Sequence, residues 1–171
     1  MAGKTLVVDH LKFSYEGLFN LSELYTVISS FFFERGWDWY EKNNTEQITP
    51  EGKQIRLVLE PWKSASDFYK IAVKIVIHFT DIKDVEVEHD GQTLKLNQGL
   101  VRMTFDGFVL HDRPGNWSLD NPVNFFINVL AQKYFYRQHF LKFETWVKND
   151  IDELHNQIKN YLNVFKYSYH A

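Results

Sequence analysis

The polar side chains best placed to act together on a ligand lie in one predicted strand. Arg102, Thr104 and Asp106 are spaced by two residues, which puts all three on one face of a strand. His111 follows near the end of that strand. If this face lines a cavity, an arginine beside an aspartate can orient a polar ligand group or take part in acid–base chemistry. If it faces water, the three form a solvated face, which the usual exposure of charged residues favours.

The sequence contains no complete metal-binding or catalytic motif. The seven histidines include no HExxH pattern, and Asp152 with His155 gives a single i, i+3 pair, so we expect no metal site and no cofactor. Ser64 lies outside any Gly-x-Ser-x-Gly elbow and has no local base, so we assign no catalytic residue. Cys is absent, which excludes disulfides, thiolate metal ligands and cysteine nucleophiles. The motifs therefore do not favour an enzyme.

Aromatic residues are the unusual feature of the composition. They make up 17% of the chain, with fifteen Phe, nine Tyr and five Trp. Two interpretations stay open: a bulky core, because aromatic side chains dominate burial, or an aromatic-lined apolar cavity. In the second interpretation, the candidate ligand-binding residues are Trp37, Trp39, Trp62, Tyr69, Phe79, Arg102, Asp106, Phe126 and Tyr134.

Length, charge and hydropathy limit the class of protein. The 171 residues fit one domain, 1–171, and 44% hydrophobic residues are enough for a sizeable core. The formal charge of −3 argues against a nucleic-acid partner, because such proteins neutralise many phosphates. No apolar run approaches about 20 residues, so we expect no membrane span. The N-terminus does not read as a signal peptide, so we expect a cytoplasmic protein.

The first elements that would position these residues are a strand, a helix and a second strand. Residues 5–15 are rich in Val, Leu, Phe and Tyr and predict the first strand. Asn20 followed by Glu23 is typical of a helix start. Apolar residues at helical spacing then predict a helix over 21–34, and Gly36 lies where its C-terminal cap is expected. Residues 37–45 predict a second strand, with Trp37 and Trp39 on one face.

The middle of the chain predicts further strands with short connections. Asp90-Gly91 is a strong hairpin signal. In residues 68–79, alternate positions from Tyr69 to Phe79 are apolar, while Lys70 and Lys74 should face water. The predicted strands are 53–62, 68–79, 85–89, 92–96 and 100–110.

The C-terminal region predicts one long helix, or two helices that meet near Asn149. From Pro122 to about Lys166 an apolar stripe keeps helical phase, and a continuous helix would be about 67 Å long. A compact domain of this size is about 40 Å wide, so segment 150–171 would project and dock on another chain, most simply a second copy. The partner-binding candidates are Ile151, Leu154, Ile158, Tyr161 and Phe165.

Together these elements predict an α+β fold. An antiparallel sheet of about six to seven strands packs against a long C-terminal helix, with one short helix after the first strand. This element order resembles the helix-grip fold of START and Bet v 1-like proteins, in which two helices usually stand where this chain has one. The resemblance implies a concave sheet closed by the terminal helix.

Three functional hypotheses follow. The first is a non-catalytic protein that encloses an apolar or aromatic small ligand between the sheet and the C-terminal helix. The second is an interaction or scaffold protein that acts through that helix. The third is a cyclase- or hydrolase-type enzyme on the same fold, which would need polar residues lining the cavity.

Overall fold

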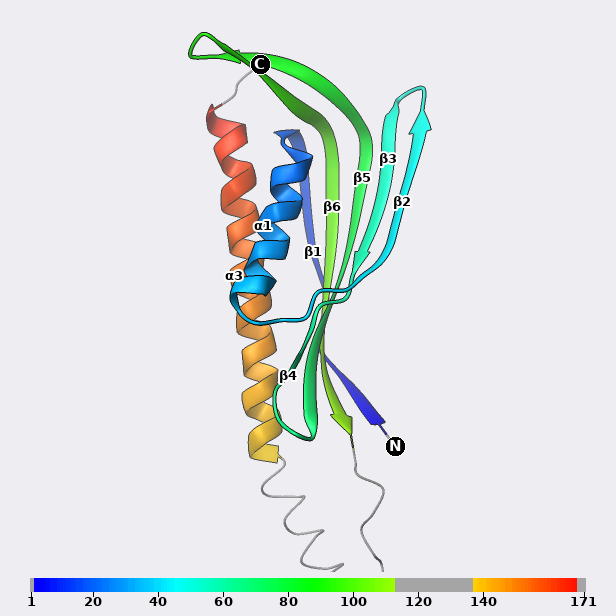
Figure 1. Ribbon diagram of the computed structural model, residues 1–171, viewed down its shortest axis with the longest axis vertical. Helices are drawn as coiled ribbons and strands as arrows, with labels where there is room; N and C mark the ends of the chain where they lie inside the picture. Colours follow the sequence, from blue (N-terminus) through cyan, green and yellow to red (C-terminus); the bar gives the residue numbers. More distant parts are fainter. Residues whose placement is uncertain (1, 113–136, 169–171) are drawn as a thin grey trace, which may run out of the picture.

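The computed structural model describes residues 2–112 and 137–168 and shows a sheet with helices on one face (Figure 1). The elements, in chain order, are β1 (Ala2–Phe19), α1 (Leu21–Glu34), β2 (Glu41–Thr49), β3 (Gly52–Leu59), β4 (Trp62–Ser64), β5 (Tyr69–His89), β6 (Gln92–Asp112) and α3 (Arg137–Ser168).

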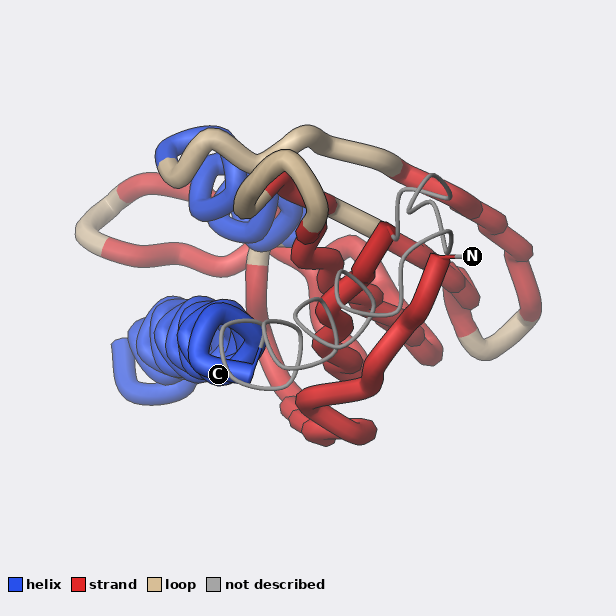
Figure 2. The backbone as a smooth tube through the Cα atoms, turned by 90° about the horizontal axis from the view of Figure 1, so that it is seen from below, coloured by secondary structure: helices blue, strands red, loops and turns tan. Residues whose placement is uncertain are grey.

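All strand pairs are antiparallel, and the order across the sheet is β1-β6-β5-β3-β2, with the short β4 paired to β5. The predicted α+β class is therefore confirmed, with six strands, a long C-terminal helix and one short helix after the first strand. The sheet curves, and Figures 1 and 2 show both helices on the same side of it. We call this side the inner face and the opposite side the outer face.

The central strands β5 and β6 are longer than predicted. Each spans 21 residues, where the sequence suggested two shorter strands in each case. The chain stays in the sheet because an irregularity between Thr80 and Lys83, with Asp81 at a φ of 54°, bends the strand without ending it. The predicted hairpin is confirmed, since Asp90 and Gly91 adopt φ values of 50° and 77° at the turn.

Helix α1 begins and ends where the sequence predicted. The Asn20 side chain accepts a hydrogen bond from the Glu23 N–H, and Gly36 adopts a φ of 72° just after the helix. The strand predicted over residues 37–45 is wrong in its first half, because β2 begins at Glu41. The Trp37 N–H instead donates to the Phe32 carbonyl, which folds the chain back under the helix.

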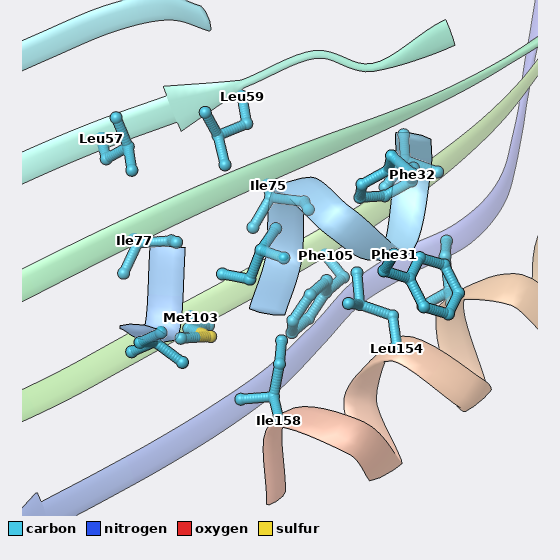
Figure 3. Packing of buried hydrophobic residues seen from close by; sticks show 14 of the residues in the cluster. Phe31, Phe32, Leu57, Leu59, Ile75, Ile77, Met103, Phe105, Leu154 and Ile158 are labelled. Atoms are coloured by element: carbon cyan, nitrogen blue, oxygen red, sulfur yellow. The ribbon is translucent and has the colours of Figure 1, made fainter. Parts of the chain in front are cut away.

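The inner face of the sheet carries the core. The alternation predicted in β5 is confirmed: Tyr69, Ile71, Val73, Ile75, Ile77 and Phe79 are all buried, and Lys70 is exposed. Lys74 is half-buried on the outer face. Figure 3 shows Ile75, Ile77 and Phe105 pointing from the sheet toward the helices. Burial of this apolar layer drives the sheet to close around α1 and α3.

Helix α3 is continuous through Asn149 and, at 32 residues, is about 48 Å long. It contacts β1, β5, β6 and α1. Its apolar stripe is buried against the chain's own core at Phe143, Val147, Ile151, Leu154, Ile158, Leu162 and Phe165. The expectation that segment 150–171 projects an exposed stripe is therefore wrong as far as residue 168, because the sheet is long enough to cover it. Neither described helix is both long and apolar enough to cross a membrane.

Candidate ligand cleft

A cleft of about 370 Å³ lies between α1 and the β2–β3 hairpin, on the inner face of the sheet. We call it the α1 cleft. It forms where α1 faces the inner side of β3 and β5, with β2 at the edge of the sheet. It is partly open to solvent and is lined by Leu21, Ser22, Leu24, Tyr25, Thr26, Ile28, Asn44, Glu46, Ile55, Leu57, Ile77 and Phe79.

The floor of the α1 cleft consists of buried apolar side chains. Ile28 is fully buried, and Ile77 and Phe79 are 1% and 4% exposed. Figure 3 shows Leu57 and Ile77 on the inner face of neighbouring strands. Ile55 is half-buried and stands at the edge of the floor. This surface can hold an apolar group without exposing it to water on its inner side.

The rim of the α1 cleft is polar and carries a negative charge. Ser22 and Thr26 are exposed on α1, while Asn44 and Glu46 are exposed on β2. The Glu46 carboxylate is 4.0 Å from Lys53 Nζ, which also lies 3.9 Å from Asp84. The cation is therefore shared between two carboxylates, and the rim keeps its acidic character.

Tyr25 is held at one side of the α1 cleft by a short chain of hydrogen bonds. The Trp39 Nε1–H donates to Tyr25 Oη over 3.3 Å, and the Tyr25 hydroxyl donates to Glu41 Oε2 over 2.8 Å. Burial raises the pKa of Tyr25, and the bond to Glu41 raises it further. The Tyr25 hydroxyl therefore stays protonated at neutral pH and donates its hydrogen bond to Glu41.

Most of the predicted aromatic residues that the structure describes do not line the α1 cleft. Phe79 lines the α1 cleft and stacks on Phe19 at 6.0 Å. Trp37 is 3% exposed and packs edge-on against Phe32, while Trp39 packs on Phe32, Phe33 and Tyr25. These rings belong to the core, as the bulky-core interpretation has it.

The two remaining aromatic candidates within the described residues, Trp62 and Tyr69, lie toward the other end of the sheet. Tyr69 packs against Phe143 and borders a second hollow of about 560 Å³ next to the Ser64–Lys70 connection. Trp62 is half-buried on the outer face, beneath Lys70 Nζ at 4.7 Å. Phe126 and Tyr134 lie outside the described residues.

The predicted polar group is on the outer face, away from the α1 cleft. Arg102 is exposed there, and His111 instead packs against Tyr69 at 4.8 Å. Asp106 is only 8% exposed, and its Oδ1 accepts a hydrogen bond from the His10 N–H over 2.8 Å. Spacing by two residues correctly predicted a shared face, but Arg102, Thr104 and Asp106 line neither the α1 cleft nor the hollow beside the Ser64–Lys70 connection.

Asp106 belongs to a cluster that sequence spacing could not reveal. Asp9, His10 and Asp106 place one ligand-type atom each within 4.8 Å of one another, with His10 Nδ1 3.1 Å from Asp106 Oδ1 and in contact with Asp9. The cluster forms where β1 bulges opposite Gly107 and His10 takes a φ of 51°. A nitrogen and two carboxylates are ligands that a divalent cation accepts, and the same groups also satisfy one another by hydrogen bonding.

The partner-binding candidates pack against the chain's own core. Ile151, Leu154 and Ile158 are at most 1% exposed, and Phe165 is 7% exposed. Tyr161 is half-buried, and its hydroxyl lies 3.0 Å from Glu23 Oε2 and 3.2 Å from the Asn20 carbonyl oxygen. These residues join α3 to the sheet and to the start of α1.

No protein-family model, no curated protein and no solved structure matches this chain.

Proposed function

We propose that the protein binds an uncharged apolar small molecule in the α1 cleft and does not chemically alter it. The observation that carries this proposal is a floor of buried aliphatic and aromatic side chains that opens to solvent through a polar rim. A volume of about 370 Å³ falls in the range of small-molecule sites, which is about 300–1,000 Å³.

The rim supports a neutral ligand with one hydrogen-bonding group. A carboxylate or phosphate on the ligand would face Glu46, whose charge is only partly offset by Lys53 at 4.0 Å. A hydroxyl or amide would instead meet the Asn44 side chain, which can donate and accept, and the Ser22 hydroxyl. We therefore expect a primary alcohol such as 1-decanol to bind better than decanoate.

This proposal moves the ligand from the place that the sequence suggested. At the contact between the sheet and α3, Phe105, Leu154 and Ile158 are each 0% exposed and belong to one core cluster (Figure 3). The two other hypotheses draw less support from the described residues. The apolar stripe of α3 that would bind a protein partner is buried, and neither Arg102 nor Asp106 lines the α1 cleft or the second hollow.

Displacement of a fluorescent apolar dye tests the proposal. Nile red should bind the native chain at a saturable site, and 1-decanol should displace it at lower concentration than decanoate does. Thr26→Trp places an indole at the mouth of the α1 cleft and should weaken binding about tenfold or more. Lys159→Trp adds the same ring to an exposed position of α3 and serves as the matched control.

The control variant should bind the dye as the native chain does. If native protein shows no saturable dye binding, or if both tryptophan variants bind equally well, the α1 cleft is not the ligand site. Circular dichroism of both variants establishes that the comparison is made between folded proteins.

A further inference from the structure

The outer face of the sheet carries three basic side chains in a row across neighbouring strands. Arg56 of β3 pairs with His78 of β5, and His78 pairs with Arg102 of β6. All three side chains are exposed. Thr45 and Ser14 continue the row at its two ends. Because directly paired residues project from the same face of a sheet, these side chains leave the surface beside one another. We call this set the basic row.

The basic row has no counter-charge on the described chain. None of its three basic side chains forms a hydrogen bond or ion pair with a described residue. Glu16, diagonal to Arg102 on β1, is not within ion-pair distance of it. Lys12, in the adjoining row, is a further exposed cation on the same face.

Arg56 and Arg102 carry like charges on the same face of the sheet, with only His78 between them. Their mutual repulsion makes the arrangement unfavourable in the free protein. The composition does not force it, because the chain has 22 acidic residues against 19 Lys and Arg. An anion placed over the row would remove this repulsion. The basic row should therefore be more stable with an anion bound than without one.

We propose that the basic row binds a small phosphate-bearing molecule through a diphosphate group. Arg56 and Arg102 stand two strands apart, about 10 Å at the backbone, so their guanidinium groups can approach one anion from both sides of His78. Guanidinium groups match phosphate oxygens with paired hydrogen bonds. The Ser14 and Thr45 hydroxyls supply neutral donors at the ends.

A small ligand fits this surface better than a nucleic acid or a membrane does. The adjoining row consists of Lys12, Thr104, Val76, Val58 and Asn43, so neither row offers an aromatic ring on which a base could stack. Neither row offers a large exposed apolar side chain for insertion among lipids. The inference is independent of the α1 cleft, which lies on the opposite face.

A titration of the full chain with inorganic pyrophosphate at low ionic strength tests the proposal. Backbone amide signals of Arg56, His78 and Arg102 in ¹H–¹⁵N spectra should shift and saturate together. Arg56→Ala and Arg102→Ala should each weaken binding about 10- to 100-fold. Arg102→Lys keeps the charge but loses the paired hydrogen bonds, and its affinity should fall between those of Arg102→Ala and the native chain.

The control is the double variant Lys142→Ala and Lys159→Ala, which removes two exposed positive charges from α3. It should bind pyrophosphate like the native chain. The proposal is overturned if no saturable shift occurs at these residues or if the control loses as much affinity as the arginine variants. It is also overturned if a single-stranded oligonucleotide or anionic vesicles bind through the row while pyrophosphate does not. Well-dispersed spectra for every variant show that each is folded.

Discussion

Asp150 is a carboxylate of α3 that folding leaves poorly solvated. It is 9% exposed, and its Oδ2 has no hydrogen-bond partner among the described residues. The Trp37 indole N–H faces it without reaching hydrogen-bond geometry. Burial raises the pKa of Asp150 above its ordinary value, although Trp37, Arg35 and Lys63 act in the opposite direction. The ionised carboxylate therefore lowers stability at neutral pH.

Asp150→Asn should therefore raise the free energy of unfolding at pH 7. A group with a raised pKa in the folded state contributes stability below its unfolded pKa, and that contribution is lost as pH rises through the folded pKa. The gain should shrink on acidification and disappear near pH 3, where Asp150 is protonated in both states. Urea unfolding at the two pH values measures this. A variant less stable than the native chain at pH 7 would show that attraction to Arg35 and Lys63 outweighs burial.

Tyr161 connects the two helices through its hydroxyl. Burial raises its pKa, and the nearby Glu23 carboxylate raises it further, so the group is a hydrogen-bond donor throughout the physiological range. Tyr161→Phe keeps the ring, which packs on Phe165 at 5.2 Å, and removes only the hydroxyl. We expect a loss of about 1 kcal/mol in the free energy of unfolding, measured with urea at pH 7. No change would mean that water replaces the bond at no cost.

At the scale of elements, the contact between α3 and β6 depends on a glycine. A Cβ atom built at Gly107 would lie 2.7 Å from Val147 Cγ1 and 2.8 Å from Ile151 Cδ1, both in buried side chains of α3. The absence of a side chain lets the helix lie close to the strand. The same glycine is opposite the β1 bulge, where Val8 is its pairing partner.

Gly107→Ala should lower the free energy of unfolding by about 1–3 kcal/mol, because the added methyl group overpacks the helix–strand contact. Gly3→Ala is the matched control in the same sheet, since its nearest contact would be 3.9 Å away. The control should change stability by no more than about 0.5 kcal/mol. Equal midpoints of thermal unfolding for the two variants would contradict this account of the contact.

Elements with a local signal could be predicted from the sequence. Asn20 and Gly36 bound α1, and alternating burial defines β5, because capping and pleating act between near neighbours. β2 carries polar residues over most of Glu41–Thr49, nearly all of them exposed, so it has no alternation to detect and its start was misplaced. Its position is fixed by pairing with β3.

The α1 cleft had no such local signal. Thr26 and Ile55 come from a helix and a strand that lie together only after the sheet has formed. The aromatic excess predicted a cavity, but most of the described rings instead fill the core, which composition alone cannot distinguish from a cavity lining. The spacing of Arg102 and Asp106 predicted that they share a face of the strand, but it could not predict whether that face is the inner or the outer face of the sheet.

At the scale of the whole molecule, α3 is part of the hydrophobic core and not an appendage. Ile151, Leu154, Ile158 and Leu162 share one core cluster with α1 and the central strands. Each fully buried aliphatic side chain contributes on the order of 1.5–3 kcal/mol of burial free energy, so the four together rival the stability of a typical domain.

A chain that ends at Lys148 should therefore fail to fold cooperatively. We expect it to lose the sigmoidal thermal transition of the full chain, followed by circular dichroism, and to expose apolar surface that promotes aggregation. The full chain serves as the reference, with light scattering on both. A truncated chain that stays soluble and unfolds cooperatively would show that the core closes without this half of α3.

The central claim is that the α1 cleft holds an apolar ligand, and methyl-detected NMR with 1-decanol tests it most directly. We predict intermolecular nuclear Overhauser effects from the decanol chain to the methyl groups of Ile55, Leu57 and Ile77, which line the α1 cleft. The methyl groups of Leu154 and Ile158, each 0% exposed on the buried side of α3, should show none. Effects confined to Leu154 and Ile158, or none at any of these residues, would contradict the claim.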